Sequence, residues 1–256
     1  MQDTVHAAPL PVITLALIVA LLLSTELGRM VARRWRREDK EAGGLATGML
    51  GIFALLIAFT YSLSLARYDK RRTEVLEEAN AIGTTANYAL MLPDAHRRAV
   101  MPLLKEYTEQ RIALGAPYDG SGFGRQVAAG NAVLTRLWGE ATAVTAEAPQ
   151  SLPAYRFVAA LNEQTNIAEA RITALRNHVP FVVLTALVGI AMVSLGFAAW
   201  SAMLGGHARY VGLSITAVTM ALLIALTIDL DRPNRGSVEI SKQPLRDALA
   251  AIPDGG

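Results

Sequence analysis

Cysteine is absent from the 256 residues, which excludes disulfide bonds, thiolate metal sites and cysteine nucleophiles. Charged residues are scarce, at 18% against roughly 25% in an average protein. The sequence has no phosphate-binding loop and no G-x-S-x-G or H-E-x-x-H motif. Its four histidines lack the spacing of a metal site: His6, His96, His178 and His207. We therefore predict no metal site, no cofactor and no enzyme activity.

Apolar residues make up 52% of the chain, and the mean hydropathy is +0.32. They concentrate in four long blocks. About 20 apolar residues cross a bilayer as a helix, and only helices or closed barrels can span one. A signal peptide begins with positively charged residues, but the flank before the first block has no Lys or Arg. We therefore predict that the first block is a retained membrane helix. The four blocks are 10–27, 45–66, 179–200 and 210–230.

These blocks predict an all-α, polytopic membrane protein with an extramembrane helical bundle. Residues 1–66 form the first membrane helix pair with a basic loop, 67–178 a four-helix bundle, 179–230 the second membrane pair, and 231–256 a polar tail. An apolar stripe at steps of three and four predicts that the second membrane helix continues to about Leu92, and a similar stripe in the fourth bundle helix runs on toward the third membrane helix. The bundle is thus formed by extensions of the second and third membrane helices. The first stripe consists of Tyr61, Leu65, Tyr68, Arg72, Val75, Ala79, Ile82 and Ala86.

Basic residues cluster at the predicted membrane edges, which is typical of a topology signal rather than of a nucleic-acid site. The short loops 28–44 and 201–209 carry seven Lys or Arg, against four in the tail. This count places 28–44 in the cytoplasm and the bundle in the periplasm. Adding the six basic residues that flank the bundle reverses the balance to ten against seven. Because the first helix usually dominates orientation, we favour a periplasmic bundle.

The stretch FTYSLSLARYDKRR (59–72) resembles the second membrane helix of bestrophins, which are pentameric anion channels. Ala66, Arg67, Tyr68 and either Arg71 or Arg72 take the places of a motif found where that helix leaves the membrane. The resemblance implies that Phe59, eight residues before Arg67, and Leu55 line the hydrophobic neck of a pore. It also implies a homo-oligomer in the lipid bilayer that passes small anions. In bestrophins the helical insert is cytosolic, which conflicts with the charge count.

The match is closer to a bacterial bestrophin-like family of unassigned function, located in the inner membrane. The segment LIAFTYSLSLARYDKRRTEVLEEANAIGTTANY carries its pattern, and IDLDRPNRG (228–236) resembles a second element after the last membrane helix. The acidic calcium-binding cluster of animal bestrophins has no counterpart. The further residues that match the family are Glu78, Ala79, Ile82, Gly83 and Thr84.

Each candidate site has a structural and a functional interpretation. Arg67, Arg71 and Arg72 either anchor the helix at the headgroups or form a cationic ring at a pore mouth. Asp229 and Asp231 either end a helix or pair with that arginine cluster. Leu55 and Phe59 contact lipid or form a dewetting constriction.

Two functions follow from these interpretations. The first is an oligomeric anion channel whose second membrane helix lines the pore. The alternative is a non-conducting sensor or scaffold whose bundle binds a ligand or partner protein. Oligomeric state distinguishes them, because a channel needs several copies around an axis.

Overall fold

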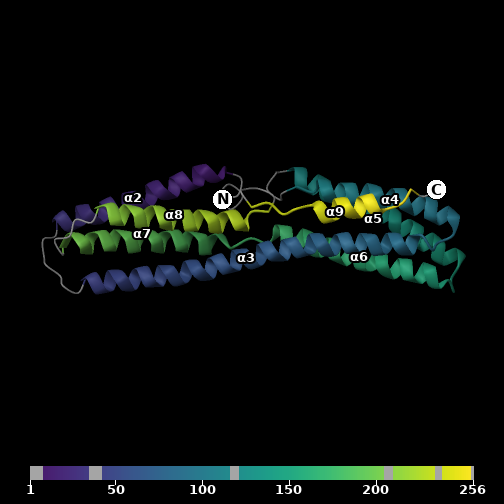
Figure 1. Ribbon diagram of the computed structural model, residues 1–256, viewed down its shortest axis with the longest axis horizontal. Coiled ribbons are helices and arrows are strands. Elements are labelled where there is room, and N and C mark those ends of the chain that lie inside the picture. The colour runs from purple at the N-terminus through teal and green to yellow at the C-terminus, as the bar shows by residue number, and fades with distance from the viewer. Residues whose placement is uncertain (1–7, 35–41, 116–120, 205–209, 234–237, 255–256) are drawn as a thin grey trace. The chain divides into compact units, whose positions relative to one another are not determined.

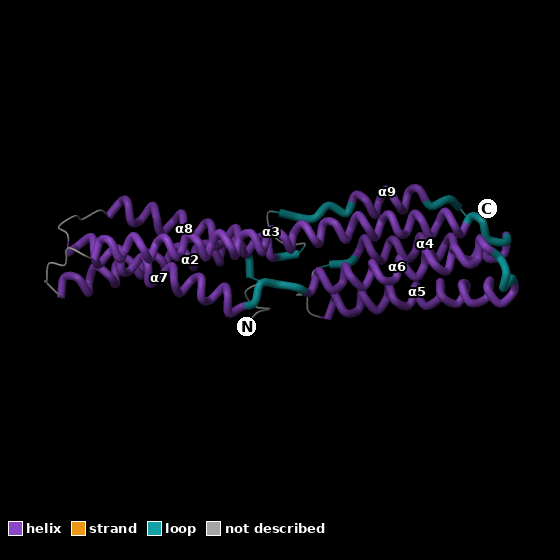
Figure 2. Tube along the Cα trace, turned by 90° about the horizontal axis from the view of Figure 1, so that it is seen from below, coloured by secondary structure: helices purple, strands orange, loops and turns teal. Residues whose placement is uncertain are grey.

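The structure is a computed structural model that describes residues 8–34, 42–115, 121–204, 210–233 and 238–254 (Figure 1). The regular secondary structure of the described residues is helical throughout (Figure 2). The chain divides into two compact units: unit 1 is Met1–Ala66 with His178–Val238, and unit 2 is Arg67–Asn177 with Glu239–Gly256. The helices are α2 (Leu10–Arg34), α3 (Ala42–Ala89), α4 (Asp94–Ala113), α5 (Ser121–Glu147), α6 (Leu152–Arg176), α7 (Phe181–Leu204), α8 (Tyr210–Asp231) and α9 (Gln243–Ala251).

Unit 1 contains α2, the first part of α3, α7 and α8. Within the described ranges, four helices are long and apolar enough to cross a membrane, which confirms the predicted four spans. Leu21, Leu187 and Ile224 are fully buried where these helices meet. Many large apolar side chains also point outward, including Leu15 and Val182, which are 63% and 75% exposed. A soluble protein rarely leaves so much apolar surface uncovered, whereas lipid covers it in a membrane protein.

Helix α3 is a single helix of 48 residues, about 70 Å long at a rise of ~1.5 Å per residue. The predicted continuity from membrane block to charged segment is therefore confirmed. Neither Gly nor Pro occurs between Ile52 and Ile82, so nothing in that stretch favours a break. Just after the helix ends, Pro93 precedes the first residue of α4.

The predicted stripe of α3 is correct in its second half and wrong in its first half. Val75, Ala79, Ile82 and Ala86 are buried as expected, but Tyr61, Leu65 and Arg72 are exposed. The buried residues of the first half include Phe53, Ile57, Thr60 and Ser64. Lipid-facing residues of a membrane helix are as apolar as core-facing ones, so hydrophobicity alone does not identify the buried face there.

Unit 2 contains the second part of α3 together with α4, α5, α6 and α9. These helices share one apolar core that includes Ile82, Leu104, Leu137 and Phe157. The hydroxyl of Ser151 accepts a hydrogen bond from the Ala154 N–H (3.3 Å) and caps α6.

A histidine links α4 to α5 within this unit. His96 lies near the start of α4, and its two ring nitrogens lie 3.1 Å from carboxylate oxygens of Glu140 and of Glu147 on α5. The hydrogen bond with Glu140 raises the pKa of His96, and Glu147 adds to the effect, while burial opposes it.

The C-terminal tail is not merely polar, because it contains α9. Leu245 is fully buried, and Ile240 and Ile252 are also buried in the same core as α4. Lys105 on α4 pairs with Asp254 just after α9. The short amphipathic helix therefore completes the packing of unit 2.

The expected run of the fourth bundle helix into the third membrane helix is interrupted at the membrane edge. Helix α6 ends at Arg176 and α7 begins at Phe181. Pro180 has no N–H to donate and disfavours a helical conformation in the residue before it. The chain is non-helical from Asn177 to Pro180.

Candidate functional site

The first candidate site is the outward face of α3 in unit 1. Leu55 and Phe59 are one helical turn apart, and their exposed fractions are 60% and 67%. On the other side of the helix, Phe53 and Ile57 are only 4% and 7% exposed and pack into the unit 1 core. The two predicted pore residues therefore point away from the other helices of their own unit.

The same outward face is made of small and uncharged residues. Steps of three and four from Leu55 and Phe59 lead to Gly48 and Gly51 before them and to Ser62 and Ala66 after them, and these four positions are exposed. No charged residue occurs between Gly43 and Ala66. This face can pack closely against another helix or line a narrow, uncharged passage.

The arginine cluster follows directly on α3, in unit 2. Arg71 is buried at 1% exposure, Arg67 is half-buried and Arg72 is exposed. We expected Arg72 on the apolar stripe, and the structure places Arg71 on the buried side instead. Lys70 is exposed and pairs with the buried carboxylate of Glu74 one turn later.

Asp229 and Asp231 are buried at the end of α8, at 1% and 0% exposure. The backbone N–H of Val179 donates to both carboxylate oxygens of Asp231, at 3.0 and 2.9 Å. His178 Nδ1 lies 4.0 Å from the same carboxylate. Asp231 therefore binds the chain just before α7, where a negative charge is favourable. The predicted pairing of these aspartates with the α3 arginines joins residues of different units and stays a prediction.

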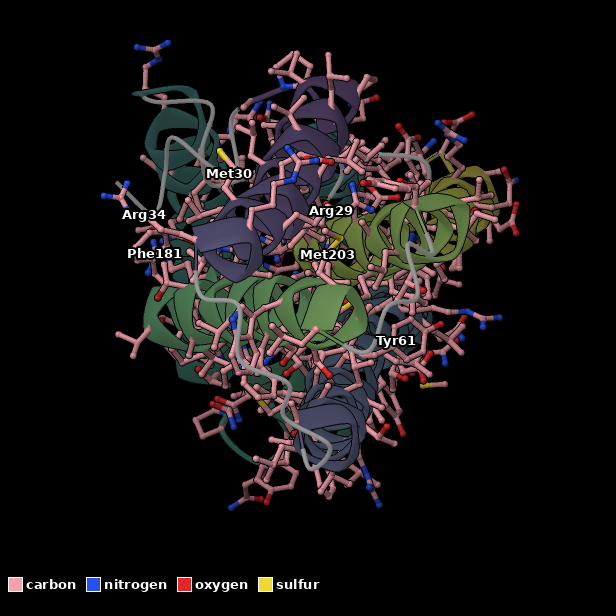
Figure 3. The ribbon with its side chains drawn as sticks, turned by 90° about the vertical axis from the view of Figure 1, so that its left-hand side faces the viewer. Arg29, Met30, Arg34, Tyr61, Phe181 and Met203 are labelled. Atoms are coloured by element: carbon pink, nitrogen blue, oxygen red, sulfur yellow. The ribbon has the colours of Figure 1, made fainter. Side chains whose placement is uncertain are left out.

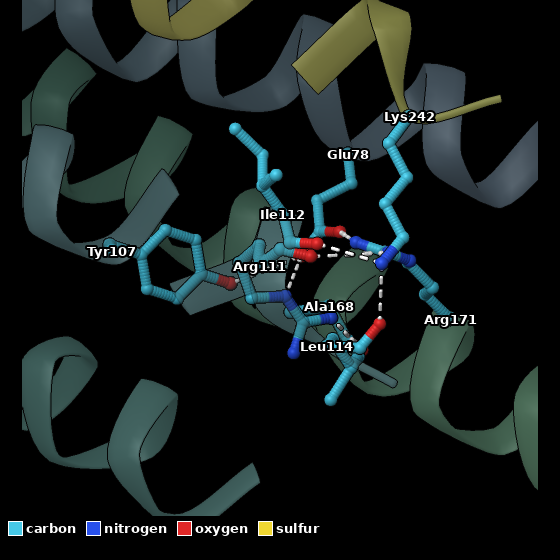
Figure 4. A network of polar contacts seen from close by, with 8 residues as sticks. All are labelled: Glu78, Tyr107, Arg111, Ile112, Leu114, Ala168, Arg171 and Lys242. Carbon is cyan, nitrogen blue, oxygen red and sulfur yellow. Dashed lines mark hydrogen bonds and ion pairs between the residues drawn. The ribbon is translucent and has the colours of Figure 1, made fainter. Parts of the chain in front are cut away.

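The second candidate site is a buried ionic network centred on Glu78 in unit 2 (Figure 4). Its two carboxylate oxygens accept hydrogen bonds from different helices. Arg111 Nε on α4 donates to Oε1, and Arg171 Nη1 on α6 donates to Oε2. The Tyr107 hydroxyl also lies 3.3 Å from Oε1. One glutamate of α3 thus connects α3, α4 and α6.

The two arginines of this network also bind backbone carbonyl groups. Arg111 Nη2 donates to the Ala168 oxygen at 3.2 Å, and Arg171 Nη2 donates to the Arg111 oxygen at 3.3 Å. Both arginine side chains are 3% exposed, and Glu78 is fully buried. Burial raises the pKa of the Tyr107 phenol above its ordinary range, so the phenol stays protonated as a donor.

Lys242, just before α9, joins the same network from the tail. Its Nζ donates to the carbonyl oxygens of Ile112 and Leu114, at 2.8 and 2.9 Å (Figure 4). A cation suits this position because the last carbonyls of a helix lack partners within the helix. Burial lowers the pKa of Lys242, and the positive charges of Arg171 and Arg246 lower it further. Through its hydrogen bonds to Ile112 and Leu114, Lys242 attaches the tail to the end of α4.

The remaining residues of the family pattern have structural positions. Ala79 and Ile82 are buried in the unit 2 core, and Tyr68 packs against that core while half-buried. Ala66 is exposed, and a Cβ at Gly83 would have no atom within 4 Å. Residues 234–236 of the IDLDRPNRG element lie outside the described residues. Among the described residues, no group of three or more His, Cys, Asp or Glu could hold a metal ion.

Fold and sites together define a class: an all-α membrane protein with four spanning helices. A model of the Bestrophin-like domain matches residues 14–245. The chain therefore belongs to the Bestrophin-like family. No curated protein matches the sequence.

Solved structures share the fold. A crystal structure of a bacterial bestrophin homologue from Klebsiella pneumoniae aligns with a TM-score of 0.71 and 12% identity, covering 94% of this chain and 97% of that chain. A point variant of the Klebsiella pneumoniae homologue aligns with a TM-score of 0.69 and 14% identity, covering 94% of this chain and 98% of that chain. At these identities the likeness concerns the fold, and it agrees with the predicted fold class.

Proposed function

We propose that this protein is a homo-oligomeric channel for small anions and that the outward face of α3 lines its pore. The observation that carries the proposal is the exposure of Leu55 and Phe59 on a helix face without charge. Membership of the Bestrophin-like family and the shared fold support the same function. Several copies around an axis would turn one exposed face per chain into a closed apolar ring.

An apolar ring of this kind controls conduction by the ease with which it fills with water. The ring would contain one Leu55 and one Phe59 from each copy. Exposed Arg72 follows on the same helix, and positive charge near a pore mouth raises the local concentration of anions. In this mechanism the aromatic ring of Phe59 sets the narrowest apolar section, and the charges favour anions over cations.

The mechanism is tested by flux measurements in proteoliposomes with a halide-sensitive dye inside. We expect chloride entry above that of protein-free liposomes. Phe59→Ser should raise the rate several-fold, because a smaller and polar side chain lets the constriction fill with water. Leu15→Ser is the matched control: Leu15 is 63% exposed on α2, outside the proposed pore, and its replacement should leave the rate unchanged.

An absence of chloride entry in the parent and in Phe59→Ser, together with a monomeric or dimeric mass in detergent, would contradict the channel. That result would favour the alternative of a sensor or scaffold whose bundle binds a ligand or partner. A mass of several copies with flux that responds to Phe59 but not to Leu15 supports the proposal.

We further propose that unit 2 is an extramembrane bundle and that the protein lies in the inner membrane of a bacterium. The short-loop charges favour a periplasmic bundle. A reporter active only in the periplasm, inserted after Gln150 in the exposed turn between α5 and α6, tests this orientation. Activity there is the expected result, and an inactive reporter would place the bundle in the cytoplasm.

A further inference from the structure

Unit 1 has an open apolar groove between α2 and α7 with a volume of about 500 Å³. Leu27 and Val31 on α2 form one wall, and Val193, Phe197 and Trp200 on α7 form the other. Leu27 and Val193 are 59% and 60% exposed, so the groove opens away from the core. It is separate from the outward face of α3 and from the Glu78 network.

The groove exists because α2 and α7 approach each other at their backbones. A Cβ on Gly28 would overlap the Gly196 carbonyl group, and a Cβ on Gly196 would lie 3.0 Å from the Ser24 hydroxyl oxygen. The Ser24 hydroxyl donates to the Met192 carbonyl oxygen across the same contact. Small residues allow this approach, and Ser24, Gly28 and Gly196 line the groove where the two helices meet.

Basic residues follow the groove on α2, just beyond its lining residue Val31. Arg34 lies three residues after Val31 and seven after Leu27, so it continues the α2 stripe that lines the groove. Arg33 and Arg34 both belong to the last turn of α2 and are exposed. Figure 3 shows Arg34 and Arg29 on different sides of α2, with Arg29 toward α8. Arg29 is engaged there by Glu26 and by the Tyr210 ring, 4.1 Å from its guanidinium carbon.

The groove has the dimensions of part of one lipid chain. From Ser24 to Val31 it follows α2 for seven helical steps, about 10 Å at ~1.5 Å per residue. One leaflet of the hydrocarbon core is roughly 15 Å thick, half of the ~30 Å bilayer core. Trp200, which lines the groove, is a residue type enriched at membrane interfaces. An acyl chain therefore fits along the groove with its headgroup near Arg34.

We propose that the groove is a binding site for an anionic phospholipid, whose acyl chain lies between α2 and α7 and whose phosphate binds Arg34. The apolar walls alone cannot select a lipid, because every bilayer lipid offers similar chains. The charge of Arg34 supplies the selectivity, since basic residues at membrane surfaces attract anionic lipids. The proposal requires insertion into the membrane but not conduction, so its outcome is independent of that of the channel.

The test uses the fluorescence of Trp200, one of the three tryptophans of the chain. Trp35→Phe and Trp138→Phe leave Trp200 as the reporter. The protein is reconstituted into phosphatidylcholine vesicles with a fixed fraction of phosphatidylglycerol, and either lipid is brominated, so that contact quenches the fluorescence. We expect brominated phosphatidylglycerol to quench roughly fivefold more than its mole fraction explains. Arg34→Gln should abolish this preference.

Arg33→Gln is the matched control, because it removes the same charge from the same helical turn but from outside the groove stripe. A preference that persists in Arg33→Gln and is lost in Arg34→Gln supports the site. Equal loss in both variants would show general surface attraction, and quenching in proportion to mole fraction would show ordinary bilayer contact. Either result overturns the proposal, as does an absence of quenching by both lipids, which would mean that protein covers the groove.

Native mass spectrometry of the chain with all three tryptophans provides a second measurement that does not depend on the tryptophan replacements. The parent and Arg33→Gln should retain phosphatidylglycerol over phosphatidylcholine, and Arg34→Gln should retain the two lipids equally. Equal retention by the parent overturns the proposal.

Discussion

Replacing Glu78 by Gln tests the buried network most sharply. The change keeps the shape of the side chain and removes its negative charge. Arg111 and Arg171 then stay buried, each at 3% exposure, without their shared carboxylate. Glu77→Gln is the matched control, since the neighbouring side chain is exposed and undergoes the same chemical change.

The expected cost follows from the burial of the two arginines. Removing one partner of a buried ion pair costs about 3–5 kcal/mol. Because the amide oxygen of Gln can still accept one hydrogen bond, we expect about 3 kcal/mol for Glu78→Gln and a larger loss for Glu78→Ala. An exposed substitution such as Glu77→Gln changes stability by within about 0.5 kcal/mol.

Urea unfolding in detergent, followed by the fluorescence of Trp138, measures this difference. Trp138 packs against the unit 2 core and donates to the Thr165 hydroxyl at 3.3 Å, so its emission reports on that unit. Trp35→Phe and Trp200→Phe remove the other two signals. Equal unfolding midpoints for Glu78→Gln and Glu77→Gln would refute the view that Glu78 holds α3, α4 and α6 together.

Further predictions concern other parts of the fold. The pKa of His96 is raised in the folded state, so its stabilisation of unit 2 is complete below pH 6.5 and is lost as the pH rises through that raised value. Because its partners are partly exposed, we expect this contribution to the free energy of unfolding to be less than about 1 kcal/mol. His96→Gln should remove this pH dependence of unfolding. Gly28→Leu should lower the folded yield in detergent through a clash costing about 1–3 kcal/mol, whereas Gly189→Ala should not, because a Cβ there has no atom within 4 Å. Asp231→Ala should lower the melting temperature of the detergent-solubilised protein, because it removes the carboxylate that accepts from the Val179 N–H just before α7. The exposed Asp247→Ala should leave the melting temperature unchanged.

The sequence identified the spans because their signal is composition, which lipid requires of any helix that crosses it. It also predicted the length of α3, since no helix breaker separates its apolar and charged parts. The buried face of the membrane part was not predictable from periodicity. Leu55 and Phe59 are outward-facing, while Thr60 and Ser64 are buried, because lipid-facing and core-facing residues are equally apolar.

The sequence analysis did not predict the Glu78 network, although the sequence contains one indication of it. Arg111 follows Val100, Leu104 and Tyr107 on one stripe of α4, and a charged residue at such a position needs a partner. The partner of Arg111 could not be predicted, because Glu78 lies 33 residues earlier. Only the packing of unit 2 brings Arg111 and Glu78 together. Lys242 gave no such signal, because it lies before α9 and not on a helical apolar stripe.

The reversal potential of the purified protein in a planar bilayer tests the central claim most directly. Under a tenfold gradient of potassium chloride, the equilibrium potentials of chloride and potassium are each about 59 mV in size and opposite in sign. An anion channel predicts currents that reverse near the chloride value. A reversal near the potassium value, or no current above that of the protein-free bilayer, would contradict it.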